Sequence, residues 1–124
     1  MNEEINNLIQ TYQHSLNEAD LDLVRTVYTD DAVFIGQRFP TATGIEEIVT
    51  LYASFFSKLD FDIEFSIQEI ELSTDFGFVR TRSHGTIIPK GQTQTGAGGN
   101  REIFLVKKIE GEWKFYRYIF NDDV

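Results

Sequence analysis

The stretch GIEEIVTLYASFFSKLDFDIEFSIQEIEL, residues 44–72, decides the fold, because its apolar period changes once along its length. Over residues 45–59 the apolar side chains recur at the spacing of one helix face, which predicts an amphipathic helix. Over residues 61–67 apolar and polar residues alternate, as they do along a strand with one buried face. The alternation changes phase near Gln68 and Glu69. That shift predicts a β-bulge and therefore a bent sheet.

Two further helices are predicted before this stretch, and strands follow it. An apolar stripe at helical spacing ends near Asn17, and Asp20 is placed to cap a second, short helix. Thr43 and Glu46 have the spacing of a capping box in front of the third helix. Strands are predicted at residues 32–35, 61–72, 76–89, 101–109 and 113–121, with turns at Asp30-Asp31 and Glu110-Gly111 and a glycine-rich loop from Lys90 to Asn100. Helices followed by long antiparallel strands predict a single α+β domain over residues 1–124.

Composition excludes several classes of function. The formal net charge is −9, which disfavours nucleic acid and anionic membrane surfaces as partners. The chain has no cysteine, so disulfides and thiolate chemistry are excluded. The polar amino terminus and the lack of a long apolar run predict no signal peptide and no membrane span, with the cytoplasm as the expected location. Eleven phenylalanines and five tyrosines supply material for a core and for the walls of a cavity.

A row of cationic and polar side chains lies within the predicted strand over residues 76–89. Arg80, Arg82 and His84 alternate with Val79 and Ser83, so all three point to the same face of the strand. Hydrogen-bonding groups flanked by apolar residues indicate the lining of a cavity. The alternative, left open here, is a solvent-facing row of an antiparallel sheet.

The order of several short motifs resembles the nuclear transport factor 2-like superfamily, in particular its SnoaL-like and ketosteroid isomerase-like members. The motifs are YQHSLNEADLD at 12–22, YTDDAVF at 28–34, GIEEI at 44–48, NREIF at 100–104, GEWK at 111–114 and RYIFN at 117–121, of which the last three are similar to an SgcJ/EcaC-type subgroup. This resemblance implies a cystatin-like fold, in which a cone-shaped curved antiparallel sheet and three N-terminal helices enclose a pocket.

The same resemblance places candidate catalytic residues. The oxyanion-stabilising tyrosine of the isomerases falls on Tyr12, and their protonated carboxylic acid falls on Glu102. Their proton-abstracting aspartate falls on Gly36, a departure that argues against steroid isomerisation. His84 is a candidate replacement base, because an imidazole titrates near neutrality.

Ligand-binding candidates have structural alternatives. Arg82 beside His84 favours an anionic ligand such as a carboxylate, whereas an ion pair between Arg82 and Glu102 would be purely structural. Tyr12 has the alternative role of a core tyrosine with a bonded hydroxyl. Four aromatic residues are candidates for the apolar wall of the pocket, with plain packing as their alternative: Tyr52, Phe56, Tyr118 and Phe120.

We expect neither a cofactor nor a metal site. The run Gly96-Ala97-Gly98-Gly99 lacks the strand-to-helix context of a nucleotide loop, and no dinucleotide fingerprint is present. The two histidines, His14 and His84, lie in different predicted elements without the spacing of metal ligands.

Two functional hypotheses follow. The first is a domain that binds a small, largely apolar molecule or a carboxylate in a cone-shaped pocket, with a cofactor-independent isomerase, cyclase or lyase activity left open. The second is a non-catalytic homodimeric interaction or assembly module. Strict alternation places Trp113, Phe115 and Ile119 on the sheet face opposite Tyr116 and Tyr118, and an outer apolar face predicts a homodimer.

Overall fold

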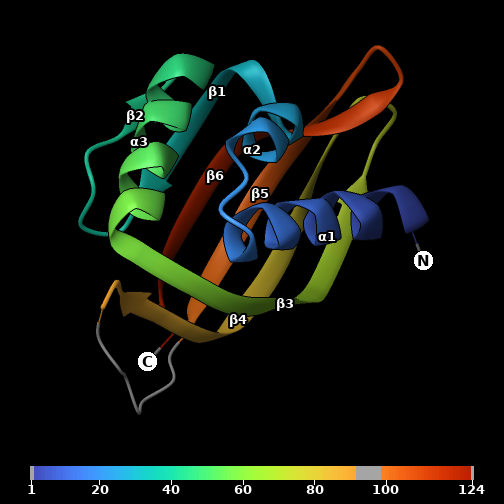
Figure 1. Cartoon of the computed structure of the whole chain (residues 1–124). Coiled ribbons are helices and arrows are strands. Elements are labelled where there is room, and N and C mark those ends of the chain that lie inside the picture. The colour runs from blue at the N-terminus through green and yellow to red at the C-terminus, as the bar shows by residue number, and fades with distance from the viewer. Residues whose placement is uncertain (1, 92–98, 124) are drawn as a thin grey trace.

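Six strands form one curved sheet, and three helices lie on its concave side (Figure 1). The computed structural model describes residues 2–91 and 99–123. The elements in chain order are α1 (Glu3–Asn17), α2 (Leu21–Val27), β1 (Tyr28–Gly36), β2 (Ala42–Thr43), α3 (Ile45–Lys58), β3 (Leu59–Leu72), β4 (Phe76–Pro89), β5 (Asn100–Ile109) and β6 (Glu112–Asp122). The strands lie in the order β2-β1-β6-β5-β4-β3. Of the predicted loop from Lys90 to Asn100, residues 92–98 lie outside the described residues.

The α+β cone predicted from the sequence is confirmed, and its strand pairing departs from the prediction at one place. All neighbouring strands run antiparallel except β1 and β6, which pair in parallel. Strand β1 is also longer than expected. It begins at Tyr28 and contains Asp30 and Asp31, so the turn predicted at these two residues is wrong. No helix among the described residues has the length and apolar character needed to cross a membrane.

Side-chain caps begin two of the helices, and glycine begins the third. Asp20 accepts a hydrogen bond from the Leu23 amide at 3.1 Å, as the sequence predicts for α2. The capping box predicted at Thr43 and Glu46 is wrong, because Gly44 is the N-cap residue of α3 and has no capping side chain. The neighbouring residue Glu47 instead accepts from the Thr43 amide at 2.9 Å.

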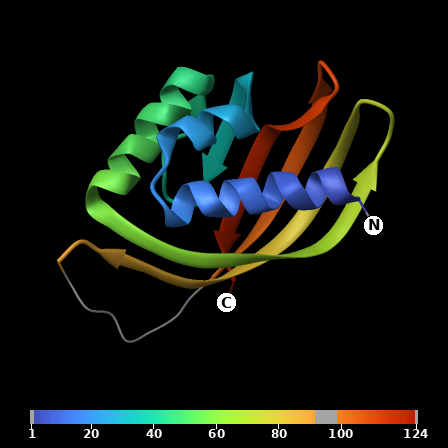
Figure 2. The ribbon, with the colours of Figure 1, turned by 45° about the vertical axis from the view of Figure 1, so that its right-hand side comes forward.

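Two features bend the hairpin of β3 and β4 toward the helices (Figure 2). The register shifts between Ile67 and Glu69, which confirms the bulge predicted from the phase change. Further along the hairpin, Gly85 pairs with Ile63 and has a φ of +134°. A Cβ atom there would lie 2.1 Å from the backbone oxygen of Asp62, so only glycine allows the two strands this close approach.

Helix α1 satisfies backbone groups on the outer edge of β3, which is the last strand of the sheet. The Asn17 amide donates to the Ile63 carbonyl at 2.8 Å and accepts from the Ile63 amide at 2.9 Å. One helix turn earlier, the Gln13 side chain accepts from the Phe65 amide at 2.8 Å. These bonds fasten α1 to the bent hairpin and protect an edge that would otherwise be open to other strands.

Strand β6 contains a second bulge, which the sequence did not predict. The register with β5 shifts so that Val106 pairs with Phe115 and Leu105 pairs with Arg117, leaving Tyr116 without a partner. Trp113 and Phe115 are therefore buried on the same face as Tyr118, and the prediction that they lie on the opposite face is wrong. Ile119 is exposed, as expected for the outer face.

We predict that the Asn17 contact contributes measurably to stability. Asn17→Ala should lower the free energy of unfolding by about 2 kcal/mol, because it leaves the amide and carbonyl of Ile63 without partners. Urea denaturation followed by circular dichroism measures this. Asn7→Ala is the control, since Asn7 is exposed on α1 and its loss should change stability by no more than about 0.5 kcal/mol. Equal effects in the two variants would contradict the role given to Asn17.

Candidate functional site

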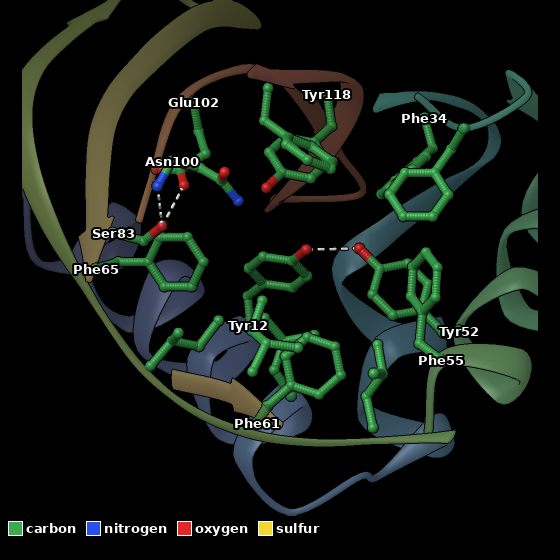
Figure 3. Close-up of a pocket in the computed structure, with 16 residues that line it drawn as sticks. Tyr12, Phe34, Tyr52, Phe55, Phe61, Phe65, Ser83, Asn100, Glu102 and Tyr118 are labelled. Carbon is green, nitrogen blue, oxygen red and sulfur yellow. Dashed lines mark hydrogen bonds between the residues drawn. The ribbon is translucent and has the colours of Figure 1, made fainter. Parts of the chain in front are cut away.

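A cavity of about 180 Å³ lies between α1, α3 and the concave face of the sheet (Figure 3). Sixteen residues line it, and nine of them are aromatic. The aromatic residues are Tyr12, Phe34, Phe39, Tyr52, Phe55, Phe61, Phe65, Tyr118 and Phe120; the others are Leu16, Leu59, Ile63, Ser83, Ile87, Asn100 and Glu102. Phe39 and Ile87 are exposed, so these two residues mark the side on which the cavity meets solvent.

The polar end of the cavity is built around Glu102 of β5, whose side chain is buried. Thr81 donates a hydrogen bond to its Oε1 atom and Ser83 donates to its Oε2 atom, each at 2.5 Å. The Ser83 hydroxyl oxygen in turn accepts a hydrogen bond from the backbone amide of Asn100 at 3.2 Å. Burial raises the pKa of Glu102 to about 7, and the two hydroxyl donors oppose this rise only in part. The carboxyl group therefore changes its protonation near neutral pH.

Three buried tyrosine hydroxyls form a hydrogen-bonded cluster in the core. Tyr12 of α1 lies 2.5 Å from the hydroxyl of Tyr52 on α3, and Tyr28 lies 2.7 Å from the same hydroxyl. Burial raises the pKa of Tyr12 to about 12. The Tyr12 hydroxyl is therefore neutral at physiological pH and is able to act as a hydrogen-bond donor. Tyr28 does not line the cavity, and it contacts the cavity residue Tyr52 through the hydrogen bond between their hydroxyls.

The cationic row of β4 faces away from the cavity, so its predicted place in the pocket is wrong. Arg80 bonds to Glu69 at 2.9 Å, Nε of Arg82 bonds to Asp123 at 2.7 Å, and His84 lies 3.2 Å from Glu64. All three side chains are exposed, which confirms the alternative of a solvent-facing row.

The structural alternative for Arg82 is also wrong, because its partner is Asp123 and not Glu102. The inner positions of β4 belong to the other phase of the alternation, in which Thr81 and Ser83 are buried. Small hydroxyl side chains fit against the carboxyl group at far lower desolvation cost than guanidinium groups. The sequence carried this signal, since arginine is rarely buried without a partner.

Most of the predicted wall residues do line the cavity. Tyr52, Tyr118 and Phe120 contribute to the wall, as does the candidate catalytic residue Tyr12. Phe56 does not line it and packs against the ring of Phe61 instead. Phe55, the preceding residue of α3, lines the cavity instead, so the predicted wall residue is wrong by one position. The apolar wall residues that the sequence analysis did not name are Phe34, Phe39, Phe55, Phe61, Phe65, Leu16, Leu59, Ile63 and Ile87.

Gly36 lies at the end of β1, where its α-hydrogens face the ring of Phe120. A Cβ atom on Gly36 would lie 2.7 Å from that ring and 2.9 Å from the ring of Phe34. Phe120 therefore occupies the space into which a longer side chain at position 36 would extend. Glycine at this position and phenylalanine at position 120 fit one another.

The comparisons with known proteins bear on this arrangement of helices, sheet and cavity. The sequence model of the SnoaL-like domain family matches residues 9–114. The chain belongs to this family. Because the match covers most of the chain, the SnoaL-like domain contains α2, α3 and five of the strands completely, together with most of the residues around the cavity.

Solved structures extend the assignment of this SnoaL-like domain to the nuclear transport factor 2-like and cystatin-like folds. A ketosteroid isomerase-like protein from Erwinia carotovora atroseptica is 32% identical with a TM-score of 0.89, and the alignment covers 100% of this chain and 99% of that one. A nuclear transport factor 2-like protein from Salmonella enterica is 19% identical with a TM-score of 0.84, over 98% and 90% of the two chains. A protein with a cystatin-like fold from Nostoc punctiforme is 17% identical with a TM-score of 0.78, over 97% and 89%.

Functionally curated proteins give no match to this SnoaL-like domain. Within residues 2–91 and 99–123, no group of three histidine, aspartate or glutamate side chains is placed to hold a metal ion. The groups that the cavity offers to a ligand are tyrosine hydroxyls, the buried carboxyl group of Glu102 and an aromatic wall.

The raised pKa of Glu102 predicts a pH-dependent loss of stability. An acid whose pKa is higher in the folded state loses stability as pH rises from its ordinary value of 4.5 through about 7. Relative to wild type, Glu102→Gln should therefore gain about 3 kcal/mol in unfolding free energy between pH 4.5 and pH 8. Urea denaturation at both pH values gives this difference. Glu71→Gln, at an exposed position, serves as the control. A difference between Glu102→Gln and wild type that is constant with pH would contradict the raised pKa.

Proposed function

We propose that this SnoaL-like domain binds a small molecule of single-ring size. The apolar part of the molecule lies among the aromatic walls, and one polar group meets Glu102 and Tyr12. The observation that carries the proposal is the contrast between the two ends of the cavity. Its wall is almost entirely aromatic and aliphatic, whereas Ser83, Asn100 and Glu102 gather at one end. A pocket with an apolar body and a few convergent polar groups is typical of small-molecule sites.

The volume of the cavity limits the size of the ligand. A dry apolar cavity of about 150 Å³ accommodates benzene in another protein. A volume of about 180 Å³ therefore suits one ring with a short substituent. A fused polycyclic compound such as a steroid needs more space than the described cavity offers. Phe120 sets this limit on one side, because its ring fills the space next to Gly36.

Binding is better supported than turnover. A protonated Glu102 and the Tyr12 hydroxyl are suited to polarise a carbonyl oxygen, as the resemblance to isomerases implies. Proton abstraction also needs a base, and position 36 holds a glycine. His84 does not replace the base, because its side chain lies on the outer face beside Glu64. An isomerase, cyclase or lyase activity would thus need a base other than His84 or the residue at position 36.

The cavity does not favour the anionic ligand expected from the sequence. It rested on Arg82 and His84 inside the cavity, and both residues lie outside it. The side chain that brings charge to the cavity is the acid Glu102, which repels a carboxylate.

We predict that Phe120 controls the size of the ligand. Phe120→Ala should raise the affinity for 2-naphthol relative to phenol by about tenfold, because the second ring gains a buried apolar space. Isothermal titration calorimetry at pH 6 measures both compounds, which are neutral under these conditions.

Phe76→Ala is the matched control for this experiment. Phe76 is exposed and lies against Tyr116, away from the cavity. The control variant should keep the wild-type ratio of affinities. An unchanged ratio in Phe120→Ala would refute the assigned role of Phe120. Failure of both compounds to bind both wild type and Phe120→Ala would count against the small-molecule function itself.

A second candidate function, a homodimeric interaction module, is favoured by the outer face of the sheet. Ile35 of β1, Ile119 of β6 and Ile103 of β5 are direct neighbours across the strands. Ile35 is 38% exposed and Ile119 is 48% exposed. We propose that this row is the centre of a homodimer interface. The cytoplasmic location expected from the sequence stays a prediction.

The dimer proposal predicts the effect of a charge in the centre of the row. Ile119→Glu should raise the dimer dissociation constant at least thirtyfold, or about 2 kcal/mol, because it buries a carboxylate in an apolar contact. Sedimentation equilibrium at micromolar concentration measures this. Gln10→Glu adds the same charge to the exposed side of α1 and should leave the dimer intact. A monomeric wild-type protein would refute the proposed interface.

A further inference from the structure

The cavity is lined by an acidic side chain but by no basic side chain. Among the sixteen lining residues, Glu102 alone carries a carboxyl group, and none is a lysine, an arginine or a histidine. The nearby guanidinium and imidazole groups of β4 lie on the other face of the sheet and have their own acidic partners. Within the described residues, Glu102 therefore has no cationic partner in the cavity.

The hydrogen bonds around Glu102 suit its ionised form. The backbone N–H of Asn100 donates a hydrogen bond to the Ser83 oxygen, so the single hydroxyl proton of Ser83 is available for Oε2 of Glu102. Thr81 donates in the same way to Oε1. Each carboxyl oxygen thus accepts one hydrogen bond and keeps a lone pair, as in an ionised carboxylate. A buried carboxylate without a counter-charge is costly, and either a proton or a cationic ligand removes that cost.

The walls of the cavity also favour positive charge. Nine of its lining residues are aromatic, and the face of an aromatic ring attracts a cation. Figure 3 shows Glu102 at one side of the cavity with Phe65, Tyr12 and Tyr118 around it. An acidic group at the end of an aromatic cavity is complementary to an ammonium group attached to an apolar body.

We propose that the ligand of this cavity is an organic monocation, a primary amine on a single ring, whose ammonium group donates hydrogen bonds to Glu102. This inference rests on the proposed small-molecule function and adds the charge of the ligand to it. Neither the sequence resemblance nor the structural neighbours assign such a ligand. The competing occupant is a neutral ketone, which would accept a hydrogen bond from the protonated form of Glu102.

The two occupants differ in the sign of their pH dependence. The groups that face Glu102 are Thr81 and Ser83 of β4, Tyr12 of α1, Phe120 and Tyr118 of β6, and Asp123 after β6. Burial raises the pKa of Tyr12 and Tyr118, so both remain neutral between pH 6 and pH 8. Asp123 is bonded to Arg82. Glu102, with its pKa of about 7, therefore changes charge in this range.

The experiment compares four probes that share one ring: benzylamine, acetophenone, benzyl alcohol and benzoate. Isothermal titration calorimetry at pH 6 and pH 8 gives the affinity of each for the full chain. Benzylamine should bind most tightly at pH 8, with an affinity about tenfold higher than at pH 6, because Glu102 must lose its proton. Acetophenone should show the opposite trend, and benzoate should bind least.

Two variants test the role of Glu102. Glu102→Gln should abolish the preference for benzylamine and its pH dependence, while the N–H donor of the new glutamine replaces the O–H donor of the protonated acid and preserves the binding of acetophenone. Ser83→Ala removes one donor to the carboxylate and should move the pH midpoint of benzylamine binding upward. It keeps the proposal testable if Glu102→Gln does not fold.

Three results separate the possible failures. Benzylamine that binds more weakly than benzyl alcohol at pH 8 would overturn the proposal. So would benzylamine affinity that is unchanged in Glu102→Gln. In both cases binding of the neutral probes would leave the small-molecule function standing. If none of the four probes binds at either pH, both the cationic ligand and the proposed function fail.

Discussion

The bend of the β3–β4 hairpin is the constraint on which the cavity depends. Ile63 and Gly85 pair at the bend, and the absence of a side chain on Gly85 permits the close approach of the two backbones. Asn17 bonds both backbone groups of Ile63 from the end of α1, so the helix is fastened to the strand where Ile63 pairs with Gly85. The bend brings the inner face of β3 over the tyrosine of α1. A straight hairpin would leave the apolar residues of β3 without a facing wall and the cavity without one of its sides.

Within that frame, the buried carboxyl group determines what the cavity is able to accept. Glu102 is 2% exposed, and the hydroxyl groups of Thr81 and Ser83 supply its hydrogen bonds. A structural role alone would be met more simply by an apolar residue, since burial of an acid lowers stability at neutral pH. The position of Glu102 at one end of an aromatic cavity instead favours the proposed role of this carboxyl group in ligand binding. Its charge can be neutralised by a proton or by a cation, so a ligand bound beside it would couple its binding to the protonation of Glu102.

The sequence predicted the elements well and the faces of two strands poorly. The bulge at Gln68 was predictable, because apolar and polar residues alternate on both sides of it and the phase shift is visible. The bulge at Tyr116 was not, because aromatic residues occupy successive positions of β6 and no phase is apparent. In β4 both phases of the alternation are polar, so period alone did not decide which set was buried. The relative desolvation costs of arginine and serine would have decided it. Tyr12 and Glu102, which the resemblance names as catalytic candidates, both line the cavity, and their catalytic role stays a prediction.

Position 36 and position 120 form one structural unit, and their fit explains why the site departs from an isomerase. A side chain at position 36 would clash with the Phe120 ring at its first carbon, so a longer residue there requires the ring of Phe120 to move. The glycine therefore removes a catalytic group and at the same time admits a ring that narrows the cavity. Both consequences point in the same direction. They favour the proposed binding of a small ligand by Tyr12 and Glu102, in a cavity too small for a polycyclic compound and without a base at position 36.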